Sequence, residues 1–408
     1  MAITRRVFLR SAVAVAGIWA LPPFLTRATC GTNSLGNKRL VVMFQRGAAD
    51  GLNIVIPHAE SAYYAMRPSI NIPQKAVLDL DGFFGLHPAM ASLQPLWSQK
   101  HLAIVHATGS PDPTRLHFLA QKFMESGTPG VKDTSDGWLN RTLHTLPRPA
   151  SKAAFRALAL GPSLPHILAG SESAFALNSI IQLGVNGRTS SGDPHRRTPM
   201  YTDPVNIGLH GAGISGAQET RISEDLGLYK LPVGADYPRS DLGESLKHLA
   251  RLIKANVGLQ VAFADIGGWD HHVNQGGTEG QLANMLLEFS QSLSAFWIDL
   301  GDHAEDTVVV TMSEFGRTAR ENGNGGTDHG HANVMFVMGG PVKGGKVYGR
   351  WPGLDQSQLH EGRDLAVTTD FRTILGEIVH RHLGNSSLHQ VFPGFENSPK
   401  NFLGILQS

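Results

Sequence analysis

Residues 38–44 (KRLVVMF) form a short run that is continuously apolar after two basic residues, and a glycine-containing segment follows at residues 46–51 (RGAADG). A short apolar run bounded by glycine is typical of a strand that is buried on both faces, as in a parallel sheet. Four later runs share this character and predict four more buried strands: residues 101–106 (HLAIVH), 259–266 (LQVAFADI), 307–311 (TVVVT) and 333–338 (NVMFVM).

Stretches with helical spacing lie between these runs. In residues 281–300 the apolar side chains recur at helical intervals, and residues 242–253 and 364–382 show a similar pattern. Strands that alternate with helices predict an α/β fold with a mainly parallel central sheet flanked by helices. Ligands bind such sheets beyond the carboxyl ends of the strands, so polar side chains at those ends are the first candidates for a site.

Composition excludes several classes of protein. A chain of 408 residues can form one large domain or two smaller ones, and its net charge of +1 gives no support for a nucleic-acid partner. The single cysteine, Cys30, excludes an intramolecular disulfide and any metal site built from several cysteines. The 19 histidines are many for this length, and histidine is the common ligand of transition metals.

The first thirty residues have the pattern of an export signal. Arg5 and Arg6 precede an apolar stretch, residues 11–25, whose core is too short for a comfortable membrane span. The paired arginines resemble a twin-arginine signal, which implies the twin-arginine export machinery as a partner and a periplasmic or secreted protein; an ordinary anchor helix is the alternative. No later segment is apolar enough to span a membrane, so the mature protein is expected to have no membrane span.

The expected mature chain, residues 31–408, is interpreted as a single domain. Residues 188–218 are rich in glycine, proline, serine, threonine and basic residues, while apolar segments resume on both sides. This composition predicts a loop or lid within the domain rather than a linker between two domains.

Side chains that bind metals gather at the ends of the expected strands. Carboxylates and imidazoles without thiolates suit Zn²⁺, Mn²⁺, iron, or the harder ions Ca²⁺ and Mg²⁺, and the set is large enough for one or two divalent ions. Two adjacent ions would clamp the attacking and leaving oxygens of a displacement at phosphorus or sulfur. The candidates are Asp50, Asp270, His271, His272, Glu314, Asp328, His329 and His331.

Each candidate also has a structural explanation. Asp50 precedes a glycine and could belong to a turn, and Asp270 could cap a helix. Glu314 could pair with Arg317 or Arg320 in an ion pair. The joint occurrence at four strand ends favours a shared site over these separate explanations.

Five strings occur in order along the chain: residues 46–53 (RGAADGLN), 85–88 (GLHP), 268–272 (GWDHH), 311–318 (TMSEFGRT) and 326–330 (GTDHG). Together they resemble an exported bacterial family named for its domain of unknown function, DUF1501. The resemblance covers essentially the whole mature chain, and the order of the strings is specific. That family is distantly similar to the alkaline phosphatase and sulfatase superfamily, which implies a three-layer sandwich and a two-metal site for phosphate or sulfate esters.

The resemblance also implies ligands. Asp50 matches an aspartate that holds one metal, Asp270 and His272 match the ligands of the other, and His329 matches a final histidine ligand. Asp328 beside it is a further candidate, and His271 ranks below His272.

Two positions depart from the superfamily pattern. Phe315 follows Glu314 where an Asp-His pair is expected, so one metal would have fewer ligands and the number and identity of the ions stay open. Leu116 stands where a hydroxyl nucleophile is expected, and Thr114 could replace it only if the turn were shifted. A water activated by the metal is the remaining nucleophile.

The sequence therefore predicts a metal-dependent hydrolase that acts on an anionic small-molecule or glycan ester. Arg115 and His117 are expected to contact the substrate anion, although a helix-start charge and a core histidine are their structural explanations. The alternative is a catalytically degenerate envelope protein that binds an anionic glycan or a partner protein, and Leu116 and Phe315 favour it. A metal-dependent mutase is a weaker third possibility, because Leu116 could not form a covalent intermediate.

Overall fold

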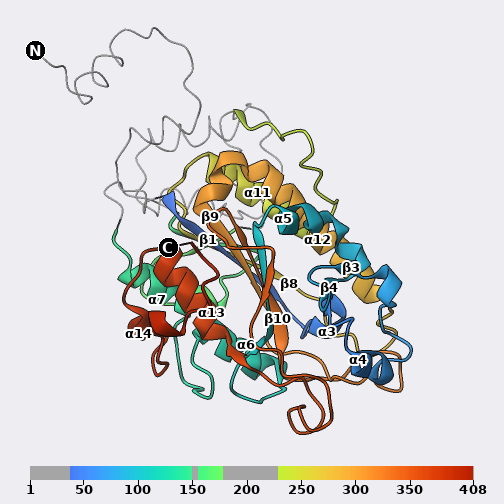
Figure 1. Ribbon diagram of the computed structural model, residues 1–408. Helices are drawn as coiled ribbons and strands as arrows, with labels where there is room; N and C mark the ends of the chain where they lie inside the picture. The colour runs from blue at the N-terminus through green and yellow to red at the C-terminus, as the bar shows by residue number, and fades with distance from the viewer. Residues whose placement is uncertain (1–36, 149–154, 178–227, 408) are drawn as a thin grey trace, which may run out of the picture. The chain divides into compact units, whose positions relative to one another are not determined.

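The computed structural model describes residues 37–148, 155–177 and 228–407 of the chain (Figure 1). The expected export signal, residues 1–30, and the expected loop or lid, residues 188–218, lie outside the described residues. Within those described ranges, no helix is both long enough and apolar enough to cross a membrane.

All five strands expected from the apolar runs are present in one central sheet. Each is buried along most or all of its length, as expected for a strand covered on both faces. They are β1 (Arg39–Gln45), β5 (Leu102–Gly109), β8 (Val261–Ile266), β9 (Thr307–Met312) and β10 (Asn333–Gly339).

Shorter strands, which the apolar pattern does not mark, extend this sheet. The order along it is β11-β5-β10-β9-β1-β8-β6-β7, and β12 pairs with β5. The added strands are β6 (Ala157–Leu160), β7 (Phe175–Leu177), β11 (Lys346–Tyr348) and β12 (Thr369–Asp370). A separate small sheet has the order β2-β4-β3 and is formed by β2 (Val55–Ile56), β3 (Leu78–Asp79) and β4 (Gly85–Leu86).

The central sheet is mainly parallel, as expected, with one exception. Strand β1 pairs in parallel with both β8 and β9, whereas β10 runs antiparallel to both of its neighbours, β5 and β9. The loop before β10 therefore reaches the same edge as the carboxyl ends of β1, β8 and β9. This reversal places residues 323–332 beside the other expected site segments.

Helices cover both faces of the sheet and form a three-layer arrangement (Figure 1). Val41 and Met43 of β1 face a core that includes Leu246 of α11 and Leu286 of α12, while Leu40 and the other alternate residues of β1 face the opposite core. The first layer contains α11 (Asp241–Lys254), α12 (Gln281–Leu300), α5 (Gln94–Ser98) and the 3₁₀ segment η3 (Pro88–Leu93), and the second contains α7 (Trp138–Thr145), α13 (Phe371–Glu377), the π-helical η6 (Ile378–His382) and α14 (Leu388–Val391).

Two of the three expected helices have the expected extent, and the third begins later. Residues 364–382 were expected to be helical throughout, but β12 pairs with β5 first, and the Asp370 side chain then accepts a hydrogen bond from the Arg372 amide at the start of α13. The remaining helical elements are α3 (Gly51–Ile54), α4 (Ser61–Met66), η2 (Gln74–Ala76), α6 (His117–Ser126), η4 (His166–Leu168), η5 (Gly301–Asp306) and η7 (Pro399–Asn401).

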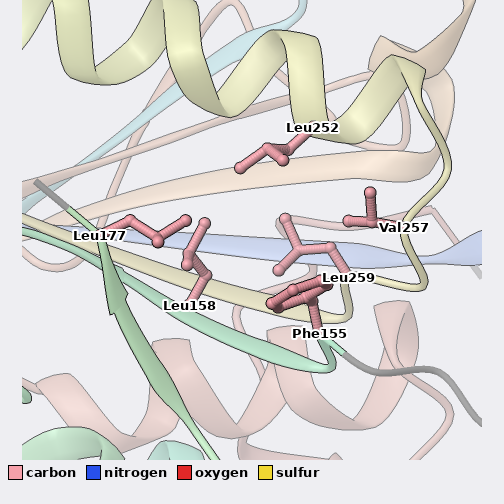
Figure 2. A pocket seen from close by; sticks show the side chains of 6 residues that line it. All are labelled: Phe155, Leu158, Leu177, Leu252, Val257 and Leu259. Atoms are coloured by element: carbon pink, nitrogen blue, oxygen red, sulfur yellow. The ribbon is translucent and has the colours of Figure 1, made fainter. Parts of the chain in front are cut away.

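A pocket between α11 and the β6–β7 edge of the sheet is lined only by apolar side chains (Figure 2). Its volume is about 210 Å³, open solvent included. With no titratable or metal-binding group in its lining, this pocket offers no chemistry. The lining residues are Phe155, Leu158, Leu177, Leu252, Val257 and Leu259.

Candidate metal centre

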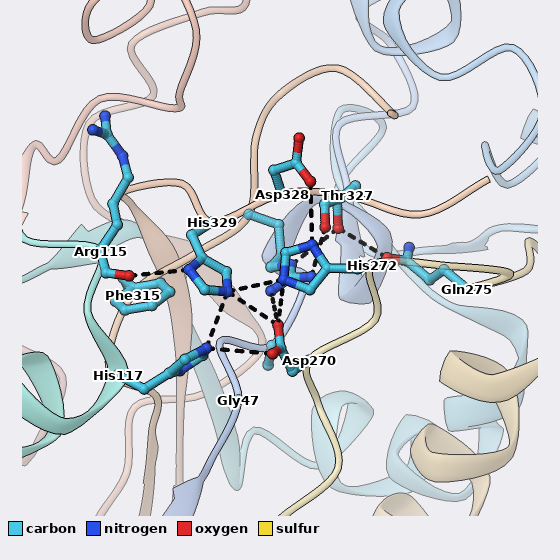
Figure 3. Close-up of polar contacts among 12 residues, drawn as sticks. Gly47, Arg115, His117, Asp270, His272, Gln275, Phe315, Thr327, Asp328 and His329 are labelled. Carbon is cyan, nitrogen blue, oxygen red and sulfur yellow. Dashed lines mark hydrogen bonds and ion pairs between the residues drawn. The ribbon is translucent and has the colours of Figure 1, made fainter. Parts of the chain in front are cut away.

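Four side chains from three separate segments converge at the edge of the sheet (Figure 3). Asp270 and His272 follow β8, His329 precedes β10, and His117 is the first residue of α6. His117, Asp270 and His329 each offer a ligand atom within a span of 4.8 Å. His272 joins them through its Nε2 atom, which lies 3.0 Å from Asp270 Oδ1.

The distances between these atoms suit the coordination shell of one metal ion. The Nε2 atom of His329 lies 3.0 Å from that of His117 and 3.0 Å from that of His272. Asp270 Oδ1 lies 3.2 Å from His329 Nε2, and Asp270 Oδ2 lies 3.4 Å from His117 Nε2. Ligands at about 2.0–2.1 Å from a tetrahedral Zn²⁺ ion are separated by about 3.3 Å, close to the spacing seen here.

The second nitrogen of each imidazole has an acceptor. His117 Nδ1 lies 2.8 Å from Glu314 Oε1, His272 Nδ1 lies 3.1 Å from Asp328 Oδ1, and His329 Nδ1 lies 3.0 Å from the Arg115 carbonyl oxygen. Carboxylates and carbonyls only accept, so this network assigns the proton of each neutral ring to Nδ1. The Nε2 lone pair of His329 then lies 3.0 Å from those of His117 and His272, where lone pairs repel each other unless a cation lies between them. The donor set therefore fits a metal ion.

Glu314 is the most buried of these acceptors. Its Oε1 atom accepts hydrogen bonds from the Gly47 amide, Gln121 Nε2 and His117, and Ser313 donates to Oε2. Burial alone would raise the pKa of Glu314, but these hydrogen bonds outweigh it and lower the pKa. The hydrogen bond with Glu314 in turn raises the pKa of His117. Glu314 is thus an ionised group that fixes the orientation of the His117 ring.

Arg317 holds the carboxylate of the cluster. Its Nη1 atom lies 2.6 Å from Asp270 Oδ1, while Nε and Nη2 donate to the hydroxyl and carbonyl of Thr327. Burial would raise the pKa of Asp270, but Arg317 more than offsets this and lowers it. Burial lowers the pKa of His329, and the charge of Arg317 adds to the effect. Asp270 is therefore ionised and His329 neutral at neutral pH, the states that bind metals.

Phe315 forms an apolar wall of the cluster instead of supplying a ligand. Its ring centroid lies 5.1 Å from that of His117 and 5.1 Å from that of His329. The side chain is buried, so it limits the access of water to one side of the two imidazoles.

The remaining expected metal ligands lie around the cluster rather than in it. Asp50 is buried and its carboxylate accepts hydrogen bonds from Arg67 and Gln275. Glu314 and Asp328 contact imidazole Nδ1 atoms from behind, as described above. Of the eight candidates named from the sequence, the structure brings Asp270, His272 and His329 together directly.

The three residues expected to act on the substrate occupy different positions. The Arg115 guanidinium bonds to Asp364 and Glu361 and points away from the cluster, although its carbonyl contacts His329 (Figure 3). Thr114 Oγ1 accepts a long hydrogen bond of 3.5 Å from the Leu116 amide. His117, expected to contact an anion, lies within the cluster. The sequence placed this residue at an expected helix start, and in the structure it is the first residue of α6.

The arginines that pair with the aspartates are not among the site residues predicted from the sequence. Arg67 and Arg317 both have fully buried guanidiniums, and neither stands at a predicted strand end. Arg317 is the alternative partner expected for Glu314, but in the structure it pairs with Asp270. His331, another candidate from the sequence, donates from Nε2 to the Ser110 carbonyl oxygen and lies outside the cluster contacts.

Comparison with known proteins places the chain in a family. Residues 37–391 match the family described as "Protein of unknown function (DUF1501)". The chain belongs to this family. No curated protein matches its sequence.

Solved structures show only distant likeness to this DUF1501 protein. The periplasmic domain of EcEptC from Escherichia coli, in complex with Zn, shares 10% identity, with coverage of 76% of this chain and 74% of that one and a TM-score of 0.35. BT1596, a 2-O GAG sulfatase, shares 9% identity, with coverage of 76% and 66% and a TM-score of 0.30. A phosphonate monoester hydrolase of Agrobacterium radiobacter shares 9% identity, with coverage of 85% and 74% and a TM-score of 0.32. Likeness at this level is too distant to say what the chain does.

Proposed function

We propose that this protein binds a divalent metal ion through His117, His272, His329 and Asp270 and hydrolyses a phosphate or sulfate ester there. The observation that carries the proposal is the convergence of three imidazole Nε2 atoms on one carboxylate, with every Nδ1 atom already bonded to an acceptor. Metal-binding histidines are held by partners of this kind on their second nitrogen. Packing alone would not need all three rings to be oriented in this way.

The donor set favours Zn²⁺ or Mn²⁺ over Ca²⁺ and Mg²⁺. Three nitrogens and one carboxylate oxygen suit transition metals, whereas Ca²⁺ and Mg²⁺ prefer shells made of oxygen. A bound divalent ion would polarise an ester oxygen and lower the pKa of a water molecule toward about 7.

The residues of the chain would prepare the centre for this chemistry. Glu314 orients the His117 ring, Arg317 keeps Asp270 ionised, and Phe315 shields one side of the imidazoles from water. Leu116 is the N-cap residue of α6 and has no nucleophilic atom. The attacking group is therefore a water molecule rather than a side chain. The export signal expected at residues 1–30 supports action on an anionic ester in the periplasm or outside the cell.

A second candidate is a protein that binds its partner without turnover. Four protein ligands around one ion resemble the closed shell of structural metal sites, whereas catalytic sites keep a position open for water or substrate. Leu116 is 68% exposed beside His117, so an apolar surface stands at the edge of the cluster. An anionic glycan or a partner protein would be the ligand in that case.

Metal content and ester hydrolysis, measured together, test the proposal. The mature protein is purified from its exporting host without chelators, analysed by mass spectrometry for metals, and assayed with aryl phosphate and aryl sulfate esters. We expect bound metal and hydrolysis of one ester class, both lost in His329→Ala. His389→Ala, which alters an exposed histidine on α14, is the matched control and should retain both.

The possible outcomes separate the two candidates. If the wild-type protein binds a metal that His329→Ala loses, but hydrolyses neither ester, the second candidate, a protein that binds without turnover, is favoured. A folded wild-type protein that neither contains nor takes up a divalent metal contradicts the proposal altogether.

A further inference from the structure

We infer that the centre holds one divalent ion rather than two, because buried arginines already occupy the carboxylates that a second ion would need. This inference rests on the proposed function, since it concerns the same centre. It concerns Asp50 and Asp270, the two aspartates that the sequence placed in a possible two-metal site, and their partners Arg67 and Arg317.

Arg67 saturates Asp50. The guanidinium is fully buried and contacts both carboxylate oxygens, with Nη1 at 2.6 Å from Oδ2 and Nη2 at 3.0 Å from Oδ1. Gln275 Nε2 adds a third donor at 2.7 Å from Oδ2. The Asp50 carboxylate therefore has a permanent positive charge against both of its oxygens, because arginine does not lose its proton in proteins.

The Arg67 guanidinium is held firmly in this position. Beyond Asp50, it donates to Asn53 Oδ1 at 2.8 Å and to the carbonyl oxygens of Thr318 and Ala319, each at 2.9 Å. All five of its N–H groups are thus matched by an acceptor. To bind an ion, Asp50 would have to leave a buried guanidinium without its counter-charge, which is strongly unfavourable.

Arg317 likewise pairs with the second aspartate, Asp270, but it contacts only one of the two carboxylate oxygens. It contacts Asp270 Oδ1 at 2.6 Å and leaves Oδ2 facing His117 Nε2 at 3.4 Å. The two arginine–aspartate pairs are joined, because Gln275 bonds to both Asp50 and Thr327, and Thr327 bonds to Arg317. A second divalent ion would therefore lie among fixed positive charges.

The other carboxylates near the centre are also engaged. Glu314 accepts four hydrogen bonds, including the one from His117, and Asp328 accepts from His272 and Asn322. What is left for metal binding is three Nε2 atoms and the Asp270 carboxylate. Of these donors, His117, Asp270 and His329 offer ligand atoms within a span of 4.8 Å, which suits one coordination shell, and His272 Nε2 adjoins it at 3.0 Å from Asp270 Oδ1.

Titration of the metal-free protein with Co²⁺ or Zn²⁺ tests this inference. We expect the signal to saturate at one equivalent, and mass spectrometry of the loaded protein to find one ion per chain. Saturation at two equivalents would overturn the inference while leaving the proposed function in place. A folded protein that binds no ion would refute the proposed function, and the inference with it.

Variants of the Asp50–Arg67 pair give an independent test. Asp50→Asn should still bind one equivalent, with the dissociation constant changed by less than about threefold, whereas Asp270→Asn should bind the metal much more weakly. If Asp50→Asn does not fold, the double variant Asp50→Leu/Arg67→Met removes both buried charges together, an exchange that proteins often tolerate. Loss of metal binding from either folded Asp50 variant would show that Asp50 is a ligand and would overturn the inference.

Discussion

At the scale of single residues, Glu314 and Asp328 each accept a hydrogen bond from an imidazole Nδ1 atom, but they differ in their exposure to solvent. The Glu314 side chain is 0% exposed and bonds to His117, while the Asp328 side chain is 57% exposed and bonds to His272. Water competes with the exposed hydrogen bond but not with the buried one. The two acceptors should therefore contribute unequally to metal binding, although each contacts an imidazole Nδ1 atom.

Glu314→Gln should weaken metal binding by about 10–100-fold, the usual effect of removing a partner of a metal-binding histidine. Asp328→Asn should weaken it less, because solvent can replace the lost acceptor. Competition with a chromophoric chelator at fixed pH measures both dissociation constants. Equal losses in the two variants would mean that burial of the acceptor does not matter here.

How well the sequence predicted the site also depends on single residues. Asp270, His272 and His329 could be predicted because each adjoins an apolar run whose end is visible in the sequence. The partner of Asp50 could not, because Arg67 reaches it from beyond α3 and β2, and nothing in the local pattern marks that contact. The place of His117 depends on how α6 docks against the sheet, which spacing along the chain does not specify.

At the scale of elements, glycines allow the loop before β10 to pack against the segment after β9. The Gly330 amide donates to the Gly316 carbonyl, and Arg317 and His329 form an isolated antiparallel bridge. A Cβ atom on Gly330 would lie 2.3 Å from the Arg317 carbonyl carbon, too close for any side chain. The close approach of these two segments brings His329 to the cluster.

Gly330→Ala should therefore push His329 away from the other ligands and weaken metal binding by at least about tenfold, by analogy with loss of an orienting partner. Gly323→Ala is the matched control, because a Cβ atom there would meet nothing within 4 Å. Metal affinity and circular dichroism of both variants check this. The explanation fails if Gly330→Ala folds and binds metal as tightly as Gly323→Ala.

Elements could be predicted from the sequence where their apolar pattern is long. The five long strands and α12 are where the runs placed them, whereas β6, β7, β11 and β12 have too few residues to stand out. The antiparallel direction of β10 could not be predicted, because strand direction is set by the connections and pairing partners. The antiparallel direction of β10 nevertheless explains why His329 precedes its strand, whereas Asp270 and His272 follow β8.

At the scale of the whole molecule, two buried histidines connect distant parts of the fold. His106 of β5 donates from Nε2 to the Val55 carbonyl and accepts the Ala107 amide at Nδ1, and His382 of η6 donates to the Arg39 carbonyl of β1. Burial lowers the pKa of each to about 4. Both rings are therefore neutral in the folded protein under all but acidic conditions.

Stability should fall as the pH is lowered from about 6.5, the pKa of an unfolded histidine, to about 4, because in this window the unfolded chain binds more protons. Each ring should contribute roughly 3 kcal/mol to the loss of unfolding free energy, and above pH 6.5 they should contribute no slope. Urea unfolding of the metal-free protein at several pH values measures this. His106→Gln should lower stability at pH 7 but flatten the dependence, since one of the rings whose pKa burial lowers to about 4 is gone. An unchanged slope in that variant would show that acid sensitivity arises elsewhere in the molecule.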